Sequence, residues 1–145
     1  MTDSFFSKID EARIVEAIRV AETRSRGEIR IHATEKPVED VMTEATTAFE
    51  SLGMTKTAER NGILIFVAPK SQKFAVLGDS GITSSVGTTP LDEMAAAMSA
   101  AFREGRFTDG LVGAVERAGQ ILSAHFPRVE GKDDRDELSN TISRG

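Results

Sequence analysis

The chain has 145 residues, 39% hydrophobic and 28% charged, which is typical of one globular domain with its own core. Its net charge is −5 and its Lys and Arg residues are scattered, so neither nucleic acid nor an anionic membrane is expected as a partner. Cysteine is absent from the sequence, which excludes disulfides, thiolate catalysis and Cys-ligated zinc. Two His residues argue against a His-rich metal centre.

The sequence carries no apolar run long enough to span a bilayer, so we expect no direct membrane insertion. Its first residues lack the basic and apolar blocks of a secretory signal. We therefore expect a cytoplasmic protein, and a monomer.

The first third of the chain predicts a helix, a strand and a second helix. Apolar residues fall at helical spacing from residue 9 to about residue 24. Residues 28–34 alternate between apolar and polar types, which indicates a strand with one wet face near a sheet edge. Helical spacing returns between Pro37, which is expected to open the helix, and Gly53, which is expected to end it.

The middle of the chain predicts a β-hairpin and is the most informative region. Residues 62–68 are apolar on both faces, as in a central strand, and residues 73–78 form the second strand after a short polar turn. We predict that these strands pair antiparallel. This pairing brings Asn61 beside Asp79 at one edge of the sheet.

The last third predicts a loop and two helices. Residues 80–89 are rich in Gly, Ser and Thr and are expected to be a loop over that sheet edge. A helix then begins at Thr89-Pro90, and a last one runs from the cap residue Thr108 to Pro127.

This order of elements predicts an α/β fold. A strand–helix–strand unit implies a parallel pair with a right-handed crossover, and the hairpin adds an antiparallel strand. We expect a three-layer α/β/α sandwich with a small mixed sheet of three to four strands and four helices. It would occupy residues 1–128.

Residues 129–145 form a polar, acidic tail that is expected to be loosely ordered. Its large apolar residues beyond Val129 are Leu138 and Ile142, four positions apart, which share a face if the segment is helical. We predict that these two residues dock the tail weakly and reversibly on the domain. The alternative is a disordered, solubilising end.

Several motifs in this order resemble one family. They are Ser25-Arg26-Gly27-Glu28-Ile29, Arg60-Asn61-Gly62 at the start of an apolar strand, Leu77-Gly78-Asp79-Ser80-Gly81-Ile82, and the aromatic, Gly-containing stretch of residues 102–111. Together they resemble the TPM domain family, named after thylakoid-lumen, phosphatase and repair-linked members, over roughly residues 5–128. The tail is similar to that of the family's short soluble branch. The resemblance implies an α/β/α sandwich, and the family includes divalent-cation binders and acid phosphatases.

Topology gathers three oxygen-bearing side chains at one sheet edge. Glu28 and Asn61 lie where the two parallel strands begin, and Asp79 follows the antiparallel strand at that edge. Two carboxylates and an amide suit a hard cation, so we predict that Ca²⁺ or Mg²⁺ binds there. Asp109 is a further candidate ligand, although its place in the first turn of a helix is explained by the helix dipole alone.

The alternative, that the same residues have only a structural role, stays open. Asn and Asp next to Gly are ordinary turn residues. Doubly wound sheets also bind ligands at the carboxyl ends of their parallel strands, which is the opposite edge.

Two functions follow as hypotheses. The first is a non-catalytic domain that binds a divalent cation and an unknown protein partner in an accessory role. The alternative, implied by the resemblance, is a metal-assisted acid phosphatase acting on phosphomonoesters, for which Arg60 is the cation placed to touch a phosphate. We favour the first, because the sequence shows no paired nucleophile and few His for a two-metal centre.

Overall fold

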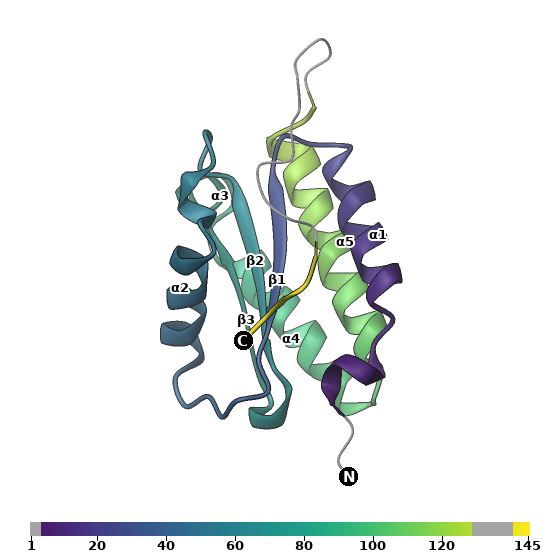
Figure 1. Cartoon of the computed structure of the whole chain (residues 1–145). Coiled ribbons are helices and arrows are strands. Elements are labelled where there is room, and N and C mark those ends of the chain that lie inside the picture. Colours follow the sequence, from purple (N-terminus) through teal and green to yellow (C-terminus); the bar gives the residue numbers. More distant parts are fainter. Residues whose placement is uncertain (1–3, 129–140) are drawn as a thin grey trace.

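A mixed four-stranded sheet lies at the centre of the computed structural model, which describes residues 4–128 and 141–145 (Figure 1). The order of the strands is β3-β2-β1-β4. Their bounds are Glu28–Ala33 for β1, Gly62–Ala68 for β2, Lys73–Gly78 for β3 and Ser143–Arg144 for β4. The predicted mixed sheet is therefore confirmed.

Strand pairing follows the predicted topology. β1 and β2 are parallel, with Glu28 opposite Gly62. β2 and β3 pair antiparallel, with Ile63 opposite Gly78, and their bounds are those predicted from the apolar pattern. A short 3₁₀ turn, η3 (Pro69–Ser71), joins them, and Gln72 adopts a left-handed backbone with φ of 53° to close it.

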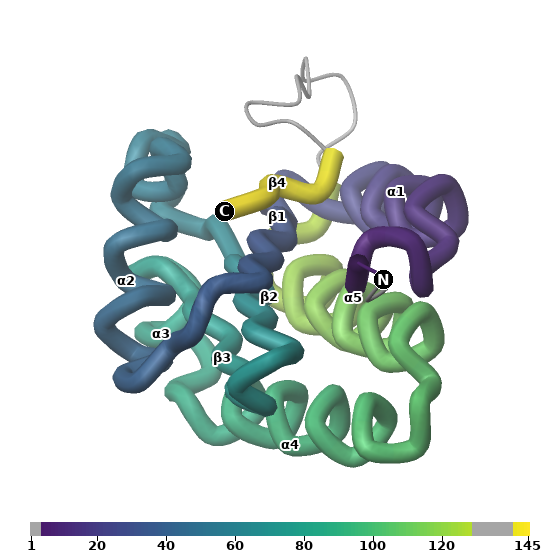
Figure 2. The backbone as a smooth tube through the Cα atoms, turned by 60° about the horizontal axis from the view of Figure 1, so that its bottom comes forward, coloured from purple at the N-terminus to yellow at the C-terminus, as the bar shows by residue number. Residues whose placement is uncertain are grey.

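Helices cover both faces of the sheet (Figure 2). On one face lie α1 (Glu11–Glu22), α4 (Thr89–Arg103) and α5 (Phe107–His125), and on the other lies α2 (Val41–Ser51). β2 is buried throughout, with alternate residues in the two apolar clusters. Among the described residues no helix has the length and apolarity that crossing a membrane requires.

The described residues contain five α-helices rather than the four predicted, because α3 (Ser80–Val86) replaces the expected loop. Its Gly, Ser and Thr residues favour helices poorly. One local and one tertiary feature compensate: the Asp79 carboxylate accepts the N–H of the next residue, Ser80, as a cap, and Ile82 is fully buried. Two 3₁₀ turns, η1 (Phe5–Lys8) and η2 (Met54–Lys56), complete the helical elements.

Two helices begin later than the apolar spacing predicts. α1 begins after Asp10, whose carboxylate accepts the Arg13 N–H at 3.1 Å. α2 begins after Asp40, whose carboxylate accepts the Thr43 N–H at 3.3 Å, and not at Pro37. In each case an aspartate satisfies a backbone donor of the first turn and so fixes the helix start.

The end of the chain belongs to the sheet. β4 pairs parallel to β1, with Ser143 opposite His32, and Ile142 is 6% exposed in the core. The Arg144 guanidinium lies 2.7 Å from a Glu11 carboxylate oxygen and 4.1 Å from the centre of the Phe6 ring. The expected docking through Ile142 is thus found, with residues 143–144 as a strand rather than a helix. Residues 129–140, including Leu138, lie outside the described residues.

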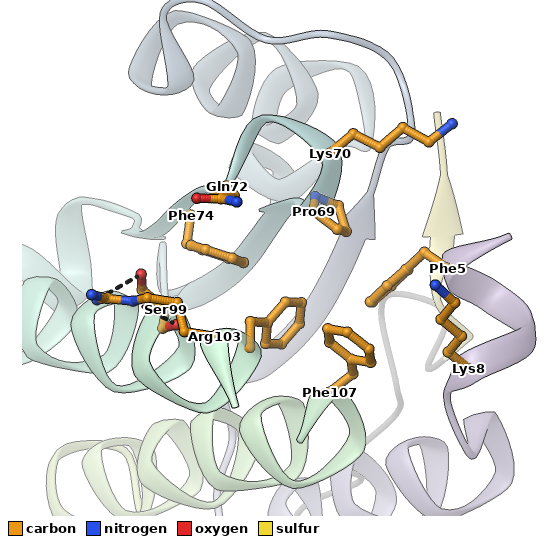
Figure 3. A pocket seen from close by; sticks show the side chains of 10 residues that line it. Phe5, Lys8, Pro69, Lys70, Gln72, Phe74, Ser99, Arg103 and Phe107 are labelled. Atoms are coloured by element: carbon orange, nitrogen blue, oxygen red, sulfur yellow. Dashed lines mark hydrogen bonds between the residues drawn. The ribbon is translucent and has the colours of Figure 1, made fainter. Parts of the chain in front are cut away.

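Phenyl rings cluster beside the β2–β3 turn, where η1, α4 and α5 meet (Figure 3). The Phe102 ring is at the centre of the cluster, with centroid distances of 4.8 Å to Phe74, 5.0 Å to Phe107 and 5.7 Å to Phe5. The two ends of the sheet therefore differ. The end where β1 and β2 begin carries α3, and the end with the β2–β3 turn carries this aromatic cluster.

Candidate functional site

Backbone hydrogen bonds bring the three predicted edge residues to one end of the sheet. The Asp79 N–H donates to the Gly62 carbonyl at 3.0 Å, and the Glu28 N–H donates to the Asn61 carbonyl at 3.4 Å. Asp79 thus lies opposite Gly62, one position from Asn61. The register prediction is confirmed for Glu28, Asn61 and Asp79.

Arg60 is the direct partner of Asp79. Its guanidinium donates two hydrogen bonds to the two carboxylate oxygens, at 2.6 and 2.8 Å. Asp79 is 6% exposed, whereas 49% of the Arg60 side chain is exposed. The hydrogen bond to Asp79 raises the pKa of the Arg60 guanidinium, and the opposite charge adds to this. A buried carboxylate is therefore neutralised by a cation that reaches it from the surface.

The loop before β2 is shaped to make this pairing possible. Arg60 has a left-handed backbone with φ of 52°, which is uncommon for a residue with a Cβ. Its carbonyl accepts the Gly81 N–H at 2.8 Å, so the loop is fastened to the first turn of α3. A Cβ at position 81 would lie 2.4 Å from the Glu59 carbonyl oxygen, so this close approach requires glycine.

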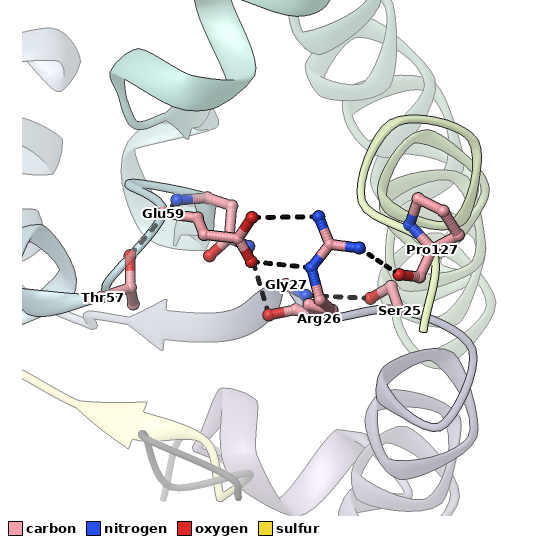
Figure 4. A network of polar contacts seen from close by, with 7 residues as sticks. Ser25, Arg26, Gly27, Thr57, Glu59 and Pro127 are labelled. Atoms are coloured by element: carbon pink, nitrogen blue, oxygen red, sulfur yellow. Dashed lines mark hydrogen bonds and ion pairs between the residues drawn. The ribbon is translucent and has the colours of Figure 1, made fainter. Parts of the chain in front are cut away.

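Asn61 is 2% exposed and contacts the polar network of Arg26, Thr57 and Glu59 that Figure 4 shows. Its side-chain amide donates to the Arg26 carbonyl at 3.2 Å, and its N–H donates to the Thr57 hydroxyl at 3.2 Å. The Arg26 guanidinium in turn donates to both Glu59 carboxylate oxygens, at 2.8 and 2.9 Å, and to the Pro127 carbonyl. These contacts tie the starts of β1 and β2 to the end of α5.

Two carboxyl groups are buried around the start of β1. Glu28 is 3% exposed, and alternation along the strand places it on the opposite face from Ile29. Glu22, at the end of α1, is 8% exposed and accepts the Ile29 N–H at 2.9 Å. The sequence did not single out Glu22, because an acid in the last turn of a helix looks like an ordinary surface residue.

Asp109 does not join the other candidates. It lies in the first turn of α5, which begins at the aromatic end of the sheet (Figure 1). Its carboxylate forms an ion pair with the Arg13 guanidinium at 3.0 Å, and both side chains are more than half exposed. The structure thus places Glu28, Asn61 and Asp79 at one end of the sheet and Asp109 at the other.

The side chains at the Asp79 edge offer few ligands for a metal ion. Within residues 4–128 and 141–145, no group of three or more His, Cys, Asp or Glu side chains is arranged to hold a metal ion. A cation at this edge would therefore need the Asn61 amide, backbone carbonyls and water beside Asp79 and Glu28. It would also have to take the place of the Arg60 guanidinium.

Comparisons with known proteins agree with the motif order. The TPM domain model matches residues 1–121. The solved structure of the BA42 protein from the psychrophilic bacterium Bizionia argentinensis is similar at 39% identity and a TM-score of 0.86, over 100% of this chain and 99% of that one.

The N-terminal domain of the cg2496 protein from Corynebacterium glutamicum shares the fold at 15% identity and a TM-score of 0.63, over 90% of this chain and 85% of that one. No curated protein matches the chain. The family match covers most of the sequence, and the BA42 protein aligns along the whole chain. The chain therefore belongs to the TPM domain family.

Proposed function

We propose that this TPM domain is a non-catalytic binding domain that takes a divalent cation, Ca²⁺ or Mg²⁺, at the Asp79 edge and serves an accessory role beside a protein partner. One observation carries the proposal: a carboxylate that is 6% exposed is neutralised by a guanidinium whose side chain is half exposed. Burial makes the Asp79 charge depend on a partner. Because the Arg60 side chain is half exposed, a cation from solvent can take the place of its guanidinium beside Asp79.

The ligands that would hold the cation are oxygen atoms that hard cations prefer. Asp79 and Glu28 would supply carboxylates and Asn61 an amide. With at most two carboxylates, we expect weak binding, with a Kd on the order of 10⁻⁴ to 10⁻³ M. Such an affinity suits a cation that is abundant where the protein works.

The state of Arg60 favours binding over phosphate chemistry. Its Nε and one Nη donate to Asp79, so one bidentate edge of the guanidinium is already occupied by a carboxylate. The phosphatase alternative is therefore an outcome that the experiment must exclude, by a phosphomonoester turnover assay.

The experiment is a titration of Ca²⁺ and of Mg²⁺ followed by residue-resolved amide chemical shifts. We expect saturable shifts around residues 61–62 and 78–82. Asp79→Asn should abolish them, and Arg60→Gln should tighten binding, because the competing cation is removed. Asp92→Asn, which removes an exposed acid from the first turn of α4, is the matched control and should change nothing.

Two results would contradict the proposal. One is an absence of saturable shifts with the native chain. The other is an unchanged affinity in Arg60→Gln, which would mean that the cation does not compete for Asp79.

A further inference from the structure

A pocket of about 580 Å³ opens at the opposite end of the sheet from Asp79, between η1, the β2–β3 turn, α4 and the start of α5 (Figure 3). Its size lies within the range of small-molecule sites. The pocket adjoins Pro69, directly after β2, and so lies at the carboxyl ends of the parallel strands. Open α/β sheets usually bind their ligands at this end.

The floor of the pocket is aromatic. Phe5, Phe74, Phe102 and Phe107 line it, which are four of the eight Phe residues in the chain. Phe5 and Phe102 are buried, while Phe74 and Phe107 are half-buried and offer ring surface to the pocket. Ring faces and edges of this kind pack against a flat or chain-like apolar body.

The rim of the pocket is basic, although the chain as a whole is acidic. Lys8, Lys70 and Arg103 line it, and none of its described lining residues is Asp or Glu. The Arg103 guanidinium is hydrogen-bonded to Ser99, at 3.3 Å from the hydroxyl. Lys8 and Lys70 make no salt bridge within residues 4–128 and 141–145. Glu35 lies within electrostatic reach of Lys70: hydrogen bonds from Ser4 and Phe5 lower the pKa of Glu35, and the Lys70 charge adds to this.

These two lysines are exposed and flexible, so their ammonium groups can turn toward a bound anion. In Figure 3 the Lys70 side chain extends away from the rings, whereas Lys8 lies beside Phe5. An apolar floor with a cationic rim is complementary to a molecule that has an apolar body and one negative end.

We propose that this pocket binds a small apolar carboxylate, an aromatic acid or a medium-chain fatty acid, with its body against the Phe cluster and its carboxylate near Lys8 and Lys70. The site is separate from the cation edge and does not depend on it. It gives the domain a second ligand of opposite charge at the opposite end of the sheet.

The test uses three probes of the same shape and different charge: naphthoate, naphthylmethanol and naphthylmethylammonium. Each is titrated into the full chain, and amide chemical shifts are followed. We expect naphthoate to shift residues 5–8, 70–74 and 99–107 and to bind about fivefold more tightly than the neutral probe. The cationic probe should bind most weakly. Decanoate, run in parallel, distinguishes an aromatic from a fatty ligand.

Substitutions in the pocket separate the contribution of the lysine charges to binding from that of the pocket's shape. Lys8→Gln combined with Lys70→Gln should remove the preference for naphthoate, whereas Lys56→Gln, an exposed lysine on η2, should retain it. Ser99→Phe places a ring in the pocket from the surface of α4 and should block all three probes. The charge variants alone test the proposal if Ser99→Phe fails to fold.

The proposal is overturned if the neutral probe binds as tightly as naphthoate, or if naphthoate shifts residues elsewhere. It is also overturned if the diffusion coefficient of the free chain falls with protein concentration and Ser99→Phe abolishes that change. A second copy of the chain would then be the occupant of the pocket.

Discussion

The two ends of the central sheet use their charges differently. At the end with Asp79, the acidic and basic groups satisfy one another: Arg60 pairs with Asp79, and Arg26 pairs with Glu59. At the end with the Phe cluster, Lys8 and Lys70 line a pocket and make no salt bridge within the described part of the chain. The polar motifs that contain Arg60 and Asp79 therefore stabilise the fold, whether or not they also bind a ligand. The pocket with an aromatic floor and basic rim, by contrast, is lined by residues that no sequence motif connects.

The largest expected effect distinguishes the buried from the half-buried rings of the aromatic floor. Phe102→Ala should lower the free energy of unfolding by about 3–5 kcal/mol, because Phe102 is buried and contacts three other rings. Phe107→Ala should cost clearly less, because its ring is half-buried. Denaturant unfolding of both variants measures the difference. Equal losses would mean that the half-buried Phe107 ring is as much a part of the core as the buried Phe102 ring.

The next effect concerns the chain end that closes the sheet near the aromatic cluster. Ile142→Ala should cost about 2 kcal/mol, at the low end for a buried Ile because the terminal segment can detach and leave no cavity. The amide shifts of β1, α1 and η1 should change together, since β4 pairs with β1 and Arg144 contacts Glu11 of α1 and Phe6 of η1. Arg144→Gln is the control that removes these contacts and keeps Ile142. Unchanged stability in Ile142→Ala would rule out β4 as a stabilising element.

At the Asp79 edge the structural and the binding roles can be separated. Asp79→Ala should cost about 1–2 kcal/mol through loss of the α3 cap. Arg60→Ala should cost less, because half of the Arg60 side chain is exposed, so water can reach the Asp79 carboxylate when the guanidinium is removed, and because Arg60 caps no helix. Thermal melts of the two variants make the comparison. If Arg60→Ala proves the more destabilising, the guanidinium is a structural element and is not replaceable by a cation.

The smallest expected effect is a pH dependence from His32. Burial lowers the pKa of His32, and the nearby Arg30 charge adds to this. The unfolded chain then binds a proton more readily than the folded one, so stability should be highest above about pH 7 and fall as the pH drops through about 6.5. In His32→Gln the melting temperature should depend less on pH over this window. An identical slope in both proteins would show that His32 does not contribute to it.

Much of the fold could be predicted from the sequence because its signals are local. The two hairpin strands, predicted near residues 62–68 and 73–78, are confirmed, since an apolar run, a short turn and a second apolar run leave little choice of register. α3 was missed because its stability comes from the Asp79 cap and the burial of Ile82 rather than from helix propensity. β4 was missed because two residues inside a polar tail show no periodicity.

The candidate sites were harder to predict for a geometric reason. Register alone placed Glu28, Asn61 and Asp79 at one edge. It could not show that the Arg60 side chain points at Asp79, because that depends on the left-handed backbone of a residue other than glycine. Nor could spacing reveal the aromatic pocket, whose walls come from four separate segments of the chain.

The cation edge is tested most directly by one comparison: amide chemical shifts of the native chain and of Arg60→Gln during the same Ca²⁺ titration. We expect saturable shifts confined to residues 61–62 and 78–82 in both proteins, with tighter binding in Arg60→Gln and no shifts around the Phe cluster. If neither protein responds, or if both bind equally well, the cation does not replace Arg60 at Asp79 and the proposed function is wrong.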